Sequence, residues 1–497
     1  MKTHVELRRG AYHDSVTLMQ VSRAVGGTDG VEAAQVAMAT ELNVEVLTGM
    51  GFAIPAEAGV NDLVIALRAA DEESLTAGLA AVEATLAELR SGPRSSGGFG
   101  EAPAPRTLGS AVTRAGANLV VISVPGPYAV TETFDAIAAG ASVMLFSDNV
   151  PVADEVRLKD AAAAADVLVM GPDCGTAVIG GVALGFANVV RRGPVGLVAA
   201  SGTGAQQVMC LLDAAGVGVS HVLGVGGRDL SAAVRGRSTR AALTALAADP
   251  ETTSVIVVSK PPDPDVLAEV RAVADGLGLT VHWAVLGPDR PDLTACVETA
   301  LTAEGHQFPN WPAVVAEESS GARGPSLRGL FCGGTLADEA IFVAEGELGP
   351  IRSNIAHDPA LLLGSDLRDP GHLVIDFGDD GLTQGRAHPM IDPSLRMDRI
   401  AAEAADPTCG VLLLDLVLGH GAHPDPAGGL AEAIRTAKEA AFAAGRDLPV
   451  VVSLTGADGD PQDRGATEAT LAAAGASVFL SNAAATRHAV GLLRSPR

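Results

Sequence analysis

The stretch Val195–Ala215, VGLVAASGTGAQQVMCLLDAA, joins an apolar run of strand length to a helical pattern through the loop Ser201-Gly202-Thr203-Gly204. The same arrangement returns where Leu327–Cys332 is followed by Gly333-Gly334-Thr335 and a second helical pattern. Such a loop directs the free backbone N–H groups of the first helical turn, with hydroxyl donors beside them, toward whatever lies above the carboxyl end of the sheet. The pattern therefore predicts strand–loop–helix units that bind an anion such as phosphate, a carboxylate or an acyl phosphate.

The composition of the 497 residues narrows the class of protein. The length suggests about three or four domains, and 59 acidic against 34 basic residues disfavour a non-specific hold on nucleic acid or an anionic membrane. Aromatic residues make up 3%, so platforms for base stacking are scarce. Five scattered cysteines without a CxxC spacing argue against a disulfide framework or a zinc site. We expect a cytoplasmic protein with no metal, no nucleic-acid partner and no membrane partner.

Alternating strand and helix patterns, interrupted by two stretches rich in Pro, Gly, Ser and Glu, divide the chain. The predicted segments are a small ferredoxin-like α+β domain at 1–92, a linker at 93–108, α/β domains at 109–192 and 193–302, a second linker at 303–326 and a last α/β domain at 327–497. Alternation on this period predicts parallel sheets with helices on both faces. The expected fold class is therefore α/β, preceded by the small α+β domain.

Seven motifs in the α/β part resemble succinyl-CoA synthetase. Those that resemble the nucleotide-fold domain of its α subunit, and then its next domain, are Val121–Tyr128, Asp135–Gly140, Gly171-Pro172-Asp173-Cys174-Gly175, Ser201-Gly202-Thr203 and Gly224–Asp229. Those that resemble the carboxyl domain of its β subunit are Leu412–Gly421 and Val450–Gly456. The resemblance implies a Rossmann-like domain of CoA-binding type at 109–192, a flavodoxin-type domain at 193–302 and a ligase-like domain at 327–497.

The chain departs from that family in two places. The family's α subunit carries a phosphorylated histidine in a His-Ala-Gly loop, and the sequence contains no such triplet. The stretch Thr107–Gly116, ahead of the strand that begins at Leu119, contains no glycine cradle for CoA, and no ATP-grasp segment is evident. We therefore expect neither a phosphohistidine relay nor a bound cofactor.

Over its whole length the sequence resembles the FdrA family. The motifs that carry this resemblance are Tyr12-His13-Asp14-Ser15-Val16, Met38–Asn43 and Gly385–Asp392. That family is identified as acyl-CoA synthetase-like, and its members include a subunit of oxamate carbamoyltransferase that works with two other gene products in anaerobic allantoin breakdown. The resemblance implies a hetero-oligomer of purine nitrogen catabolism that converts oxalurate and phosphate to oxamate and carbamoyl phosphate.

Three helix N-termini are expected to hold phosphate or carbamoyl phosphate and a small carboxylate substrate. The residues assigned to them are Ser201, Gly202, Thr203, Gly204, Gly333, Gly334, Thr335, Gly419, His420 and Gly421. The predicted catalytic residues are Arg228, Arg386 and His388, because guanidinium groups offer forked donors to anions and His388 shares a polar loop with Arg386. Electrostatics and proximity would then drive the transfer without a protein nucleophile.

Each motif also has a plainer interpretation. The Gly/Ser/Thr loops fit ordinary N-caps and tight turns, and Cys174 fits a small buried side chain. The loop that contains His420 and His423 fits local hydrogen bonding better than metal binding. Three functions stay open: a catalytic or co-catalytic carbamoyltransferase subunit, an acid-CoA ligase, and a non-catalytic subunit that keeps the folds as an interaction scaffold.

Overall fold

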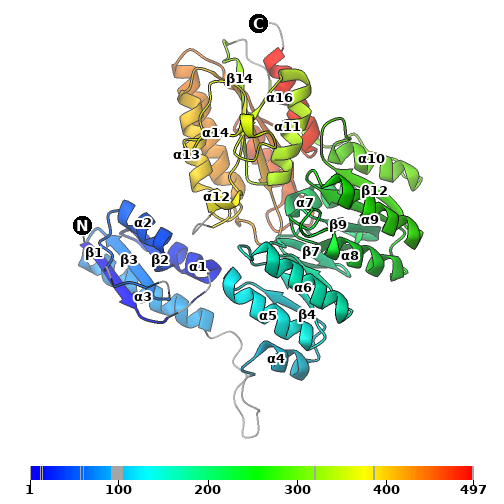
Figure 1. The fold of residues 1–497 in the computed structure, drawn as a ribbon. Coiled ribbons are helices and arrows are strands. Elements are labelled where there is room, and N and C mark those ends of the chain that lie inside the picture. The colour runs from blue at the N-terminus through cyan, green and yellow to red at the C-terminus, as the bar shows by residue number, and fades with distance from the viewer. Residues whose placement is uncertain are drawn as a thin grey trace. The chain divides into compact units, whose positions relative to one another are not determined.

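The computed structural model describes residues 2–11, 13, 15–55, 57–59, 61–90, 105–317, 321–383 and 387–494 (Figure 1). The chain forms two compact units, Met1–Ala104 with Asp380–Ala387, and Pro105–Asp379 with His388–Arg497. Most of the predicted linker at 93–108 lies outside the described residues. In the described part of the chain, no helix combines the length and the apolar character needed to cross a membrane.

The first unit is a small α+β domain. Its elements are β1 (Lys2–Arg8), α1 (Ser15–Gly26), β2 (Val31–Met38), α2 (Glu41–Gly49), β3 (Leu63–Ala69), α3 (Glu72–Arg90) and the short α12 (Asp380–Thr383). The strands form an antiparallel sheet in the order β1-β3-β2. Its core contains Val21 of α1, Ile65 of β3 and Val82 of α3, all fully buried. The sequence patterns predicted these elements except α2 and α12. Helix α2 starts where the Thr40 side chain accepts a hydrogen bond from the Asn43 N–H.

The second unit begins with a three-stranded parallel sheet. Its elements are α4 (Leu108–Ala115), β4 (Leu119–Ile122), α5 (Gly126–Ala138), β5 (Ser142–Leu145), α6 (Val152–Ala164) and β6 (Val169–Met170), with the strand order β4-β5-β6. Strands β4 and β5 are each followed by a helix that packs back on the sheet, as the alternation predicted. A capping box between Thr107 and Ser110 starts α4.

A six-stranded sheet follows, with the strand order β12-β11-β9-β10-β7-β8. Its elements are β7 (Thr176–Ile179), β8 (Val182–Gly185), β9 (Arg192–Ala199), α7 (Gly202–Ala214), β10 (Val219–Gly224), α8 (Arg237–Ala248), β11 (Ser254–Ser259), α9 (Pro264–Leu277), β12 (Thr280–Val285) and α10 (Leu293–Ala303). The hairpin β7–β8 was not predicted. It pairs antiparallel with β10 through β7, so this sheet extends across the predicted boundary at 192/193.

The last part is a seven-stranded sheet with the strand order β13-β19-β18-β17-β14-β16-β15. Its elements are β13 (Ala313–Val314), β14 (Ser326–Phe331), α11 (Gly334–Leu348), β15 (Arg352–Ser353), a 3-10 turn (Pro359–Leu361), β16 (Leu373–Asp376), α13 (Ser394–Ala405), β17 (Cys409–Val417), α14 (Pro426–Ala443), β18 (Val450–Thr455), α15 (Arg464–Ala473), β19 (Ala476–Phe479) and α16 (Asn482–Arg494). Helices α11 and α16 lie on one face of this sheet and α13 and α14 on the other (Figure 1). The predicted fold class is confirmed.

The second predicted linker, 303–326, is not simply a linker. Its residues Ala313–Val314 form the edge strand β13, which pairs antiparallel with β19. The Trp311 indole N–H donates to Glu298 Oε1 over 2.8 Å, and its ring packs against the core. The segment therefore carries the edge strand of the last sheet.

The six- and seven-stranded sheets share one hydrophobic core. The cluster includes Leu197 and Leu211 of the first sheet layer and Leu336 and Val451 of the second. Buried polar groups cross the same boundary: Gln207 Nε2 donates to the Leu480 carbonyl over 2.9 Å. Because the packing is continuous, α7 and α11 hold fixed positions relative to each other.

Candidate functional site

Helix α7 starts immediately after β9 at a side-chain cap. Ser201 has an extended backbone, and its Oγ accepts a hydrogen bond from the Gly204 N–H over 2.9 Å. The same hydroxyl donates to Thr335 Oγ1 over 2.6 Å. Thr335 belongs to the first turn of α11, so this one bond joins the N-termini of the two helices.

Helix α11 starts at Gly334, and a buried carboxylate holds the loop before it. The amides of Cys332 and Gly333 donate to the two oxygens of Asp415 over 2.8 and 2.9 Å. Asp415 lies on β17 and pairs with the buried Arg396 at 2.7 Å. The carboxylate thus fixes the loop while the guanidinium balances its charge.

The two N-termini approach so closely that each requires glycine. A Cβ on Gly333 would stand 2.8 Å from Thr203 Oγ1 and 2.9 Å from its Cβ, and a Cβ on Gly204 would stand 2.9 Å from Thr335 Cγ2. Neither distance leaves room for a methyl group. We call this junction, formed by 201–204 and 333–335, the helix pair.

The helix pair concentrates donors for an anion. First-turn amides have no acceptor inside their own helix, and the positive ends of both helix dipoles meet at this point. The Thr335 hydroxyl, whose oxygen accepts the Ser201 hydrogen, adds a donor beside the amides. Two helix ends of the same polarity side by side repel each other, and a bound anion would relieve that repulsion.

Lys260 brings a positive charge to the helix pair. It follows β11, and its Nζ lies 2.7 Å from the position of a Cβ on Gly334 and 3.5 Å from Asp338 Oδ2. Burial alone would lower the pKa of Lys260, but the carboxylates of Asp338 and Asp376 raise it above the ordinary lysine value. The side chain is 37% exposed, so this protonated ammonium can meet a ligand.

Asp376 and His388 also lie next to the α11 loop. Asp376 ends β16, its Oδ2 stands 2.5 Å from the position of a Cβ on Gly334, and burial raises its pKa to about 7 against the attraction of Lys260. A Cβ on Gly378 would lie 2.6 Å from the Cys332 carbonyl and 2.8 Å from His388 Nε2. Burial, helped by the charge of Arg396, lowers the pKa of His388 to about 4, so its ring is neutral near pH 7.

The structure brings together two of the three predicted anion loops, Ser201–Gly204 and Gly333–Thr335, and sets His388 beside the second. The third predicted loop, Gly419–Gly421, does not begin a helix. The next helix, α14, starts only at Pro426. The amides of Gly419 and His420 donate to Gln462 Oε1 and the Ala187 carbonyl, and Gly421 packs on Phe186. The candidate site therefore does not include Gly419, His420 or Gly421.

Arg228, one of the two predicted arginines, does not join the helix pair. Arg228 donates to the Val150 carbonyl over 2.8 Å and pairs with Glu155 Oε2 at 3.0 Å. It ties the three-stranded sheet to the six-stranded one. Arg386 lies outside the described residues.

Sequence reasoning missed Lys260, Asp338 and Asp376. The sequence contained a signal for two of them. Lys260 directly follows one apolar strand, and Asp376 is the last residue of another. The carboxyl ends of parallel strands lie at one edge of the sheet, so both residues could have been expected there. Asp338 stands one turn into α11, and its carboxylate accepts a hydrogen bond from His357 Nε2 over 3.0 Å.

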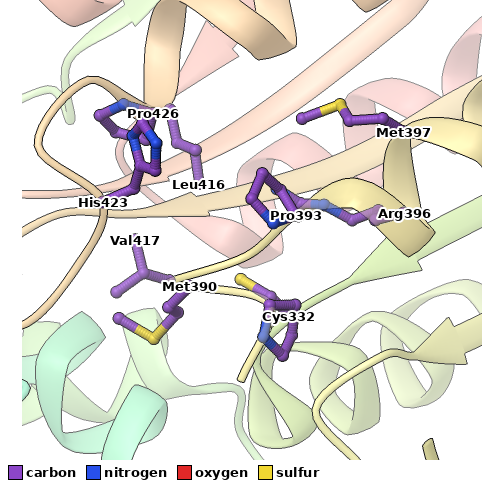
Figure 2. Close-up of a pocket in the computed structure, with 10 residues that line it drawn as sticks. Cys332, Met390, Pro393, Arg396, Met397, Leu416, Val417, His423 and Pro426 are labelled. Carbon is purple, nitrogen blue, oxygen red and sulfur yellow. The ribbon is translucent and has the colours of Figure 1, made fainter. Parts of the chain in front are cut away.

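A small cavity lies behind the α11 loop (Figure 2). Its volume of about 10 Å³ gives room for about one water molecule. The lining residues are Cys332, Pro389, Met390, Pro393, Arg396, Met397, Leu416, Val417, His423 and Pro426. The cavity is too small for an acyl phosphate, so the helix pair remains the candidate site.

These features define an α/β protein with a CoA-ligase domain. Residues 330–492, from the end of β14 into α16, match the CoA-ligase family model, and residues 1–103 match the model described as AllF, heavy metal-associated domain. The Escherichia coli K12 protein YahF is 40% identical over 493 residues, which cover 93% of this chain and 92% of YahF. The chain belongs to the YahF family.

Two further relatives are α subunits of ADP-forming succinate–CoA ligase. The subunit of Aquifex aeolicus is 29% identical over 164 residues, or 32% of this chain and 52% of that protein. Subunit alpha 2 of Archaeoglobus fulgidus is 36% identical over 121 residues, or 24% of this chain and 42% of that protein. The chain thus spans about half the length of these subunits, and it is homologous to them.

The description of the first family model names a heavy metal. Soft metals bind cysteine thiolates, and residues 1–103 contain no cysteine. In the ranges that the structure describes, no group of three or more His, Cys, Asp and Glu side chains is placed to hold a metal ion. These residues do not fit a heavy-metal site.

Proposed function

We propose that the chain is an acyl-CoA synthetase-like enzyme, or a subunit of one, whose helix pair holds the phosphate of an acyl phosphate. The observation that carries this proposal is the meeting of two helix N-termini through the 2.6 Å bond between Ser201 and Thr335, beside Lys260. The CoA-ligase match at 330–492 and the succinate–CoA ligase relatives support the class.

The chemistry follows from the charges at this site. In transfer from an acyl phosphate to a thiol, sulfur attacks the carbonyl carbon, the bond from that carbon to the phosphate oxygen breaks, and phosphate leaves with the electron pair and takes up the thiol proton. First-turn amides and Lys260 stabilise the charge that grows on the leaving phosphate. His388 Nδ1 accepts the Met390 N–H over 3.3 Å, so the neutral ring carries its hydrogen on Nε2 and does not take the thiol proton.

A second candidate is carbamoyl transfer of the oxamate type. Carbamoyl phosphate is also a carbonyl carbon bonded to phosphate, and phosphorolysis of oxalurate breaks its carbamoyl C–N bond while phosphate forms the new C–O bond and nitrogen gains a proton. The sequence contains no His-Ala-Gly triplet, which favours direct transfer over a phosphohistidine relay. The resemblance to the FdrA family supports this candidate.

An acceptor assay separates these candidates. Purified chain, alone and with the products of neighbouring genes, is supplied with acetyl phosphate or carbamoyl phosphate and with CoA or oxamate. We expect acetyl phosphate to release phosphate only when CoA is present. If phosphate is instead released from carbamoyl phosphate only when oxamate is present, the result supports carbamoyl transfer. If phosphate binds but no acceptor stimulates its release, the chain is a non-catalytic scaffold.

We also expect no phosphorylated form of the chain. Because the His-Ala-Gly triplet is missing, incubation with radiolabelled ATP or GTP should leave no acid-labile label on the protein. Filter binding after base and acid quenching measures this directly. A stable phosphohistidine on any of the eleven histidines would contradict direct transfer.

A further inference from the structure

The hydroxyl of Thr176 is a buried polar group without a partner. Thr176 starts β7, it is 2% exposed, and within the described residues its Oγ1 makes no hydrogen bond. Native proteins rarely leave such groups unsatisfied. Strain, a catalytic role, or a bound water, ion or ligand explains the exceptions.

Thr176 lies against the N-terminus of α7. Its Oγ1 stands 3.1 Å from the position of a Cβ on Gly202, the first residue of that helix. Helix α11 approaches the same terminus through different residues, Gly204 and Thr335. The N-terminus of α7 is therefore flanked by one threonine hydroxyl on each side.

The backbone around Thr176 is held in place by its neighbours. The Cys174 thiol donates to the Thr176 carbonyl over 3.6 Å, and a Cβ on Gly224 would stand 2.5 Å from that carbonyl oxygen. Thr176 is also paired with Gly185 across the β7–β8 hairpin. The backbone that carries this hydroxyl is thus fixed next to α7.

We propose that Thr176 is a ligand-binding residue that donates its hydroxyl hydrogen to the acyl oxygen of an acyl phosphate whose phosphate occupies the helix pair. This inference rests on the proposed function and narrows its ligand to phosphates that carry a carbonyl group. A neutral hydroxyl suits a carbonyl oxygen, whereas the charged amide ends and Lys260 suit the phosphate. Thr176 is then a specificity-determining residue.

The test compares Thr176→Val, which keeps the shape and removes the hydroxyl, with Thr176→Ser, which keeps the hydroxyl. Acetyl phosphate carries the carbonyl and ethyl phosphate lacks it. We expect Thr176→Val to weaken acetyl phosphate binding about tenfold and ethyl phosphate binding less than about twofold. Thr176→Ser should bind both ligands within about twofold of the unsubstituted chain. Titration calorimetry on the full chain measures each affinity.

Ser254→Ala is the matched control, because Ser254 is also a buried hydroxyl without a partner in the described residues but stands at the opposite end of the same sheet. It should leave both affinities unchanged. Equal losses for the two ligands in Thr176→Val, or no loss for either, would overturn the assignment of Thr176 to the acyl oxygen. If the unsubstituted chain binds neither ligand, the proposed function itself fails.

Discussion

Gly333→Ala is expected to weaken the binding of phosphate and acetyl phosphate by roughly 100-fold or more while the chain stays folded. The new Cβ would stand 2.8 to 2.9 Å from three side-chain atoms of Thr203, so the two helix N-termini must separate. Loss of one or two hydrogen bonds to a charged ligand accounts for an effect of this size. Titration calorimetry measures the affinity, and circular dichroism checks the fold.

Two variants control this prediction. Gly346→Ala adds a methyl group to the same helix where no heavy atom lies within 4 Å, and it should bind phosphate normally. The double variant Gly333→Ala with Thr203→Gly removes the clashing side chain and should recover most of the affinity. Normal binding by the single variant Gly333→Ala would show that the close approach of the helices does not form the site.

Lys260→Met is expected to have the second largest effect, again roughly 100-fold on phosphate affinity. A full charge about 4 Å from an anion near a protein surface is worth up to about 4 kcal/mol. The substitution also leaves the buried carboxylates of Asp338 and Asp376 without their cation, so we expect a lower melting temperature. Thermal unfolding and phosphate titration measure the two effects separately.

The double variant Lys260→Met with Asp376→Asn distinguishes binding from folding. Removing one of the two carboxylates should return part of the lost stability, because less uncompensated negative charge stays buried. Phosphate affinity should stay low, since no cation has been restored. Recovery of phosphate affinity together with stability would mean that Lys260 acts only on the fold.

The regular helices and strands could be predicted because the spacing of apolar residues along the sequence indicates them. Strands such as Val219–Gly224 and Ser254–Ser259 are apolar runs followed by helical patterns, and the structure places both in one parallel sheet. The β7–β8 hairpin was missed although Gly180-Gly181 separates two short apolar runs, and both glycines adopt positive φ. The strand β13 has only two residues, which is too short for a periodic pattern of apolar residues to indicate it.

The site could be predicted only in pieces. Sequence reasoning found Ser201–Gly204 and Gly333–Thr335 separately, since each has a local signature of a helix start. Their meeting depends on how two sheets pack on one core, and no local pattern encodes that. Arg228 was assigned to the anion by its charge, but Glu155 holds it in a partly buried pair. Lys260 reaches the helix pair because β11 ends beside it, which also depends on sheet order.

The most direct test of the account is a crystal structure of the full chain grown with saturating acetyl phosphate. The account predicts phosphate density between the first turns of α7 and α11, within hydrogen-bond distance of their amides and of Lys260 Nζ. It also predicts the acyl oxygen next to Thr176. Density for the ligand elsewhere on the chain, with the helix pair empty at a ligand concentration that saturates binding in solution, would contradict it.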